Sequence, residues 1–199
     1  NTNWQDEVLR TSFSHDYALS VSGSLNWLPY RVSASYTDNQ GIIKNSSLQR
    51  TTAGITLTPK FFDGPLQITA NPNGTYAKSR EADMGAIGTA LSYNPSRPVR
   101  YAYPTVGDSG MTMFNGYWNI TEENGSINPL CSQNPVQMLN ERRNVGETYQ
   151  GNGNIQFDYA LHFLPDLHLN LNLGFQVSKN QSWNDTKPNS IMSWNDQNL

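Results

Sequence analysis

Residues 164–179, LPDLHLNLNLGFQVSK, alternate between apolar and polar side chains almost without error. A period of two is typical of a β-strand that has one apolar and one polar face. The central question is therefore whether the apolar face contacts a protein core or the hydrocarbon of a membrane. The apolar parity, which we predict to face lipid, comprises Leu167, Leu169, Leu171, Leu173, Phe175 and Val177.

The same alternation recurs along the chain and predicts an all-β fold, an antiparallel meander of about six strands. Pro72 interrupts one of these segments and indicates a bulge or bend, because proline lacks a ladder donor. One short helix is expected over residues 84–93, and the tail from Asn180 is expected to be a loop. The further predicted strands are 17–24, 30–38, 49–59, 66–78 and 154–163.

The connections differ in length at the two ends of the predicted sheet. Short turns are expected near residues 25–29, 60–65 and 164–166. Longer connections are expected at 39–48, beyond 180 and above all at 79–146. Short turns at one end and long loops at the other are typical of an outer-membrane barrel.

The composition favours a membrane barrel over a solvated sheet. Charged residues make up only 15% of the chain, against about 25% in soluble proteins, and the polar parities are rich in Ser, Thr, Asn and Gln. The net charge of -3 and the lack of a basic stripe argue against nucleic-acid binding. A soluble β-sandwich that binds carbohydrate or another ligand stays open as the alternative. Aromatic residues gather near the short turns, as in interfacial girdles: Trp27, Tyr30, Phe61, Phe62, Tyr159 and Phe163.

The chain has neither a signal peptide nor an apolar run of about 18 residues, the length of a membrane helix. We therefore expect either a cytosolic protein or a piece of a longer one, and both ends read as arbitrary cuts. The single cysteine, Cys131, has no metal-ligand spacing to any histidine, so no metal site and no cofactor is predicted.

No catalytic residues are predicted. The adjacent carboxylates Asp6 and Glu7 would point to opposite faces of a strand, and no triad, P-loop or dinucleotide fingerprint occurs. A glycan-cleaving enzyme, the third hypothesis, would need two carboxylates across a cleft. Several N-x-[ST] triplets are expected by chance in a chain so rich in Asn, Ser and Thr.

Three long phrases carry a family resemblance: NTNWQDEVLRTSFSHDYALSVSG, YRVSASYTDNQGIIKNSSLQRTTAGITLTP and NGTYAKSREADMGAIGTALSYNPSRPV. They closely resemble the SusC/RagA family of TonB-dependent outer-membrane transporters of Bacteroidetes. The resemblance implies a large barrel of the 22-stranded type, of which residues 1–199 form a segment, with residues 79–146 as an extracellular loop. Because about six strands cannot close a barrel, and an open edge is not tolerated in lipid, a longer parent chain is expected.

The resemblance also implies partners that the chain itself does not contain. These are a SusD-like surface lipoprotein as a lid, outer-membrane lipid, and TonB acting through a plug domain that is absent from this chain. The imported nutrient would be a glycan or a peptide.

The long loop is the best candidate for substrate contact. Aromatic faces together with planar polar groups suit sugar rings and are typical of small-ligand pockets. The alternative is that these side chains pack the loop against the barrel or the lid. The predicted substrate-binding residues are Tyr101, Tyr103, Trp118, Asp108 and Asn128.

Overall fold

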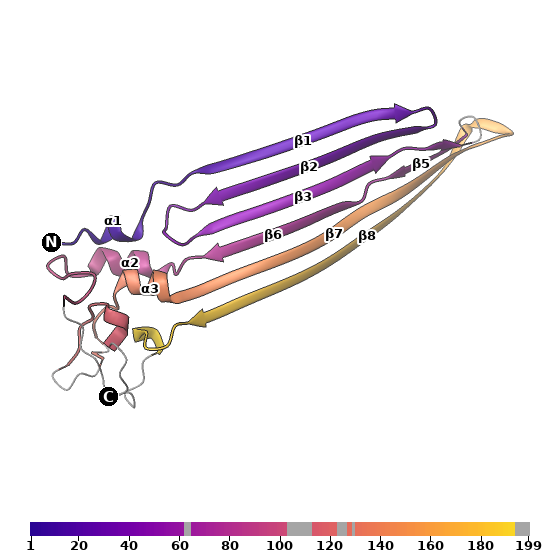
Figure 1. Ribbon diagram of the computed structural model, residues 1–199. Coiled ribbons are helices and arrows are strands. Elements are labelled where there is room, and N and C mark those ends of the chain that lie inside the picture. Colours follow the sequence, from indigo (N-terminus) through magenta and orange to yellow (C-terminus); the bar gives the residue numbers. More distant parts are fainter. Residues whose placement is uncertain (62–64, 103–112, 123–126, 129, 194–199) are drawn as a thin grey trace.

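A computed structural model describes residues 1–61, 65–102, 113–122, 127–128 and 130–193. The described residues form one antiparallel sheet with a group of helices at one end (Figure 1). Among them, no helix has the length and apolarity needed to cross a membrane. The strands are β1 (Ser14–Leu25), β2 (Leu28–Gln40), β3 (Ser47–Leu57), β4 (Lys60–Phe61), β5 (Leu66–Ala70), β6 (Asn73–Glu81), β7 (Arg142–Leu161) and β8 (Leu164–Thr186).

The strands follow one another across the sheet in chain order, which confirms the predicted meander. β1 pairs with β2, β2 with β3, β3 with β6, β6 with β7, and β7 with β8. β5 lies in line with β6, and the two are separated only at Asn71 and Pro72. Leu57 is three positions from Gly54, and their partners Ala70 and Asn73 are also three positions apart. Pro72 therefore interrupts the ladder without shifting its register.

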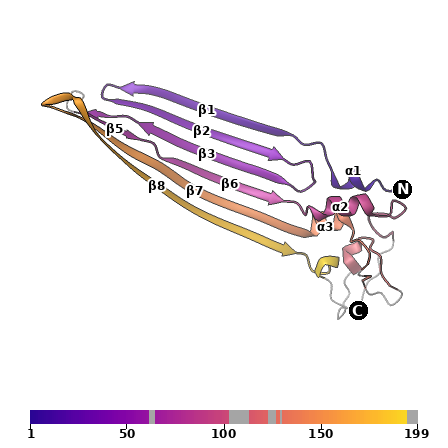
Figure 2. The same cartoon turned by 180° about the vertical axis from the view of Figure 1, so that it is seen from behind.

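The two ends of the sheet differ as the connection lengths predict. The β1–β2 and β7–β8 hairpins turn tightly at one end, which we call the turn end, and all helices lie at the other (Figures 1 and 2). The connection between β2 and β3 is shorter than expected, since the two strands reach Gln40 and Ser47.

Two strands are longer than the sequence pattern indicated. β7 begins at Arg142, inside the expected loop 79–146, and β8 continues to Thr186 through the expected loop-like tail. Apart from Val145, Tyr149 and Trp183, the two extensions carry polar residues and glycine, so the apolar alternation is lost there. The backbone pairing nevertheless continues from Ala160 opposite His168 to Arg142 opposite Thr186, because a ladder needs only backbone donors and acceptors.

The helices form a unit with its own core, which we call the helical cap: α1 (Trp4–Val8), α2 (Gly85–Ser92), α3 (Pro135–Glu141) and the described segments between and beside them. α2 confirms the helix expected at 84–93, whereas α1 and α3 were not predicted. Within the described ranges, the buried apolar cluster lies in this cap and includes Trp4, Val8, Ile43, Ala86, Ala90, Tyr93, Tyr117, Val136 and Leu139.

Candidate functional site

The strand pairing collects the apolar parities on a single face of the sheet, which we call the apolar face. Leu171 lies opposite Phe157, and Phe157 in turn lies opposite Ile68. On the same face, toward the β1 edge of the sheet, Val32 lies between Val21 and Ile55. These side chains remain open within the described residues: Leu169 is 57% and Val177 68% exposed. The six residues predicted to face lipid all belong to this face by parity.

A row of tyrosines crosses the apolar face near its helical end. Tyr17, Tyr36, Thr51, Tyr76, Tyr149 and Lys179 are successive register partners across the sheet. The rings of Tyr76 and Tyr149 lie 4.9 Å apart between centroids. The next row toward the cap is polar or charged and contains His15, Asp38, Lys78 and Glu147. We call the row from Tyr17 to Lys179 the tyrosine row.

Aromatic residues also mark the turn end, where the rings of Trp27 and Phe61 lie 5.7 Å apart. On β7, Tyr149 and Tyr159 bound the apolar band, which spans about 33 Å at about 3.3 Å per residue. At the tilt of about 40° that barrel strands adopt, this corresponds to roughly 25 Å, the height of the apolar band of a membrane barrel.

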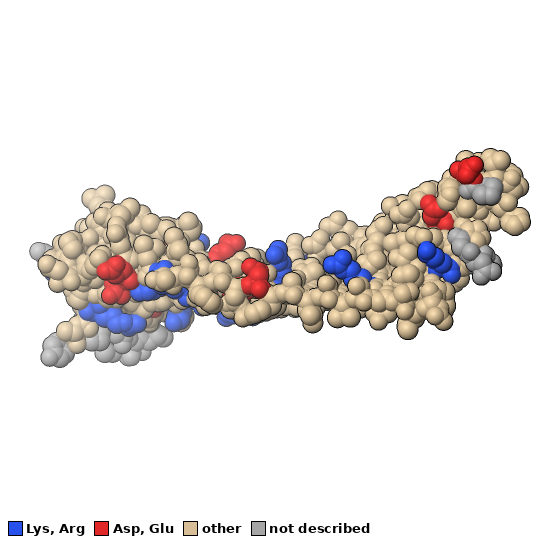
Figure 3. Space-filling view, turned by 90° about the horizontal axis from the view of Figure 1, so that it is seen from above, with Lys and Arg blue, Asp and Glu red and all other residues tan. Residues whose placement is uncertain are grey.

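The opposite face, which we call the polar face, carries amides and hydroxyls. Asn71 donates to the Oδ1 of Asn154 at 3.2 Å, and Asn154 donates to the Oδ1 of Asn172 at 3.3 Å. Nearer the turn end, Asp158 lies 2.6 Å from the Nδ1 of His168 and accepts from Asn170 at 3.2 Å. Seen along the edge of the sheet, charged side chains are scattered among uncharged ones (Figure 3). By register the polar face also carries Asp16 and Asp158 together with Arg31 and Arg50, so its charges of both signs nearly balance.

Gly153 allows the break at Pro72 to fit in the middle of the sheet. A Cβ atom on Gly153 would lie 2.8 Å from the carbonyl oxygen of Asn71 and 2.9 Å from the Cα of Pro72. It would also lie 3.0 Å from the ring of Phe175 on the apolar face. The missing side chain therefore lets the proline and the phenylalanine approach β7 closely.

A buried polar network fixes the helical cap. Asn134 caps α3 by accepting from the backbone nitrogens of Val136 and Gln137, at 3.0 and 3.2 Å. The side chain of Gln137 donates to the Glu141 carboxylate at 2.6 Å and accepts from Asn119 at 2.8 Å. The second Glu141 oxygen accepts from Asn115 at 2.9 Å. Each of these buried groups has a partner, as buried polar groups require.

Two of the predicted substrate-binding residues are brought together by this cap. The rings of Tyr101 and Trp118 lie 6.4 Å apart, and the Arg97 guanidinium lies 4.8 Å from the Trp118 ring. The hydroxyl of Tyr101 donates to the carbonyl of Asn119 at 3.0 Å. Both side chains are half-buried, so each packs the loop and keeps one surface open.

The other three predicted residues do not extend this pair in the described part of the chain. The Oδ1 of Asn128 accepts from the backbone of Leu130 at 2.9 Å, which closes a local turn. Tyr103 and Asp108 lie outside the described residues. The proposed substrate contact therefore depends on Tyr101 and Trp118 among the residues whose surroundings are known.

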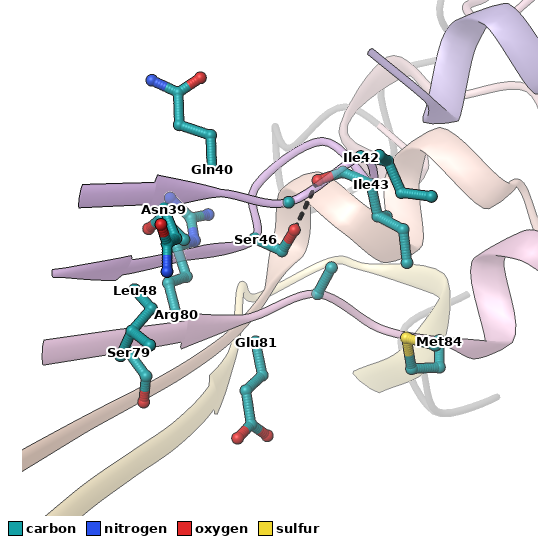
Figure 4. A pocket seen from close by; sticks show the side chains of 13 residues that line it. Asn39, Gln40, Ile42, Ile43, Ser46, Leu48, Ser79, Arg80, Glu81 and Met84 are labelled. Carbon is teal, nitrogen blue, oxygen red and sulfur yellow. Dashed lines mark hydrogen bonds between the residues drawn. The ribbon is translucent and has the colours of Figure 1, made fainter. Parts of the chain in front are cut away.

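Sequence reasoning missed a hollow of about 560 Å³ where β2, β3 and β6 enter the helical cap. Figure 4 shows Asn39, Leu48 and Arg80 on its strand side and Ile42, Ile43 and Met84 on its cap side. Ser46 closes the β2–β3 turn by donating to the carbonyl of Ile43 at 2.8 Å. No local pattern could have indicated this hollow, because its walls come from separate segments.

Burial raises the pKa of Tyr93 above the ordinary value of a phenol. The side chain is 5% exposed, and its hydroxyl donates to the carbonyl of Trp118 at 3.1 Å. The ring packs edge-on against Trp4, with centroids 4.7 Å apart. Tyr93 thus links α1, α2 and the loop that carries Trp118.

Comparison with known proteins agrees with this architecture. No protein-family model matches the chain. The chain is 36% identical, over 98% of its length, to the TonB-dependent receptor SusC of Bacteroides thetaiotaomicron. It is 26% identical, over 97% of its length, to the TonB-dependent receptor P3 of Formosa agariphila. The fold matches the solved structure of the RagAB peptide importer with a TM-score of 0.63, at 18% identity and over 95% of the chain.

The sheet is thus a portion of a TonB-dependent receptor barrel, which the fold match and both relatives support. By sequence the chain is similar to the receptors SusC and P3 over nearly its whole length. It spans about a fifth of the length of the relatives, 20% of SusC and 18% of P3. The relatives are receptors rather than enzymes, as the lack of a catalytic motif predicted.

Proposed function

We propose that the chain forms part of the wall of an outer-membrane nutrient importer, with its apolar face in lipid and its polar face toward the lumen. The single observation that carries this proposal is the collection of the apolar parities on one face, bounded by aromatic residues at both ends. In a soluble protein, a second layer would have to cover an exposed apolar face of this size, and the described residues do not supply one.

The importer would take up oligosaccharides or peptides through TonB, with a SusD-like lipoprotein above the helical cap. The similarity to SusC and to the RagAB importer supports the energy source and the lid. The uncharged hydrogen-bonding groups of the polar face suit neutral polar substrates. Tyr101 and Trp118 are the proposed substrate contacts in the cap, and Tyr103, Asp108 and Asn128 stay predictions. A soluble carbohydrate-binding sandwich is the competing assignment.

The face assignment is tested by placing one arginine on each parity of β8 in the parent protein. Leu171→Arg should impair insertion into the outer membrane, at a cost of about 2–4 kcal/mol near the bilayer midplane. Asn172→Arg, on the polar face, is the matched control and should insert almost normally. The measurement is the fraction of folded barrel in outer-membrane fractions, from its shifted migration on unheated gels.

Equal insertion of the two variants would contradict the face assignment. Recovery of the parent protein in the soluble fraction would favour the sandwich instead. For the substrate contacts, Trp118→Ala should lower uptake of the imported nutrient while leaving the folded fraction unchanged. Unaltered uptake would leave Trp118 with a packing role only.

A further inference from the structure

A second hollow, of about 630 Å³, is lined by residues of the paired strands β7 and β8 close to the helical cap. Its side chains from the apolar face are Arg143, Val145, Glu147, Trp183 and Asp185. The register places Arg143 opposite Asp185 and Val145 opposite Trp183. By parity these side chains share a face with Phe175 and Val177, but they lie beyond the tyrosine row, on the side of the cap.

The side chains that line this hollow combine an aromatic surface with charged hydrogen-bonding groups, a combination that suits a sugar ring. Trp183 is 44% exposed and offers an aromatic surface, and carboxylates and a guanidinium stand beside it. Glu147 is held by Lys78 at 3.2 Å. Within the described residues, Arg143 and Asp185 make neither an ion pair nor a hydrogen bond with another side chain. Their polar groups are therefore available to hydroxyls and to phosphate.

Basic side chains exceed acidic ones around the hollow. Lys78, Arg80, Arg143 and Lys179 lie on this face of β6, β7 and β8, and Glu147 and Asp185 are the acidic residues among them. Lys179 belongs to the tyrosine row itself, next to Tyr149. An excess of cations at this level complements an anionic group, and guanidinium groups bind phosphate with paired donors.

The apolar band begins directly below these groups. Val177, Phe175 and Leu173 follow Lys179 along β8, and each is at least half exposed. Along one strand the surface therefore presents sugar-binding and cationic groups, then a phenol row, then aliphatic side chains. A ligand that matches all three levels has a sugar head, a phosphate and acyl chains.

We propose that the outward surface of β6–β8 binds a phosphorylated glycolipid of the outer leaflet. The sugar would lie on Trp183, with one phosphate at Arg143 on the cap side of that ring and a second phosphate at Lys179 on the opposite side. The acyl chains would cover Val177 and Phe175. The inference rests on the proposed function, because it requires the apolar face to contact lipid.

The test uses the full-length protein in detergent, with diphosphorylated lipid A as the probe and native mass spectrometry as the readout. The variants are Trp183→Ala and the double variant Arg143→Gln/Lys179→Gln. Loss of two charge-assisted contacts should lower lipid A retention by at least about tenfold. The matched control is Arg50→Gln, a charge removal on the polar face that should leave retention unchanged. Folding of each variant is verified by migration on unheated gels.

Two competing lipids test which parts of the glycolipid are needed for binding. Phosphate-free lipid A should compete weakly, and phosphatidylglycerol, which has a phosphate but no sugar ring, should compete weakly as well. Full competition by phosphatidylglycerol or by inorganic phosphate would overturn the glycolipid assignment. Equal retention in the double variant and in Arg50→Gln would overturn the site.

The face assignment fails separately, in the comparison of Leu171→Arg with Asn172→Arg. If that pair differs as expected while lipid A retention is unaffected in folded variants, only the glycolipid site is wrong. If the pair does not differ, the proposed function fails first.

Discussion

The helical cap and the sheet differ in whether their apolar side chains are buried within the described chain. The cap buries its apolar side chains against one another, and Leu139 is only 2% exposed. The sheet leaves its apolar side chains open, and Leu171 is 54% exposed. The cap is therefore stabilised by contacts within the described chain, whereas the sheet needs a cover from outside it. Hydrogen bonds join the strands, but they do not supply the burial that usually stabilises a sheet.

The largest effect is expected in the core of the cap. Leu139→Ala should lower the free energy of unfolding of the cap by about 2–5 kcal/mol, because it leaves a cavity among Trp4, Val8 and their neighbours. The matched control is Leu91→Ala on α2, where the side chain is 67% exposed and little burial is lost. Hydrogen exchange of the α2 and α3 amides measures the difference in the parent protein.

The same experiment tests whether the two regions are independent. If the cap has its own core, exchange in the middle of β8 should not change in Leu139→Ala. Equal acceleration in β8 and in α3 would mean that the cap and the sheet unfold as one unit, and the contrast between them would then fail.

The second prediction concerns a place where two strands of the sheet approach each other closely. Gly153→Ala should destabilise the folded barrel by about 1–3 kcal/mol, because the added methyl group meets Asn71, Pro72 and Phe175 and forces the strands apart. Gly151→Ala is the control, since a Cβ atom there meets nothing within 4 Å. Urea unfolding of the barrel in lipid vesicles measures both variants. A neutral Gly153→Ala would show that the break at Pro72 adapts freely.

The same contrast explains what the sequence could and could not predict. Alternation located β1, β2, β3 and β8 as far as Lys179, because one apolar and one polar face leave a period of two in the sequence. It failed for the first half of β7, where Gly151 and Gly153 occupy positions of the apolar face. There, backbone pairing with β6 and β8 determines the strand, and the side-chain pattern does not indicate it.

The cap was harder to predict because its contacts join distant segments. Asn119, Asn134 and Gln137 form one network, yet each is an ordinary polar residue in the sequence. One local signal was present and overlooked: Asn134 followed by Pro135 is a preferred helix start. The cation–π contacts of Arg97 with Trp118 and of Arg100 with Tyr117 depend on the folded loop and leave no pattern in the sequence.

The smallest expected effect is the response of the cap to alkali, which should not extend to the sheet. Tyr93 has a raised pKa because it is buried, so the folded cap keeps its phenol proton at a pH where the unfolded chain has lost it. The stabilising contribution is complete below about pH 10, the ordinary tyrosine value, and is lost as the pH rises from there toward the folded pKa. For one proton the loss is at most about 1.4 kcal/mol per pH unit.

Exchange of α2 amides between pH 9 and pH 11, corrected for intrinsic rates, should show a loss of stability on the order of this slope. Tyr93→Phe should lower the stability at neutral pH, because the hydrogen bond to Trp118 is lost, and should flatten the alkaline slope. A slope that persists in Tyr93→Phe would assign the response to another group.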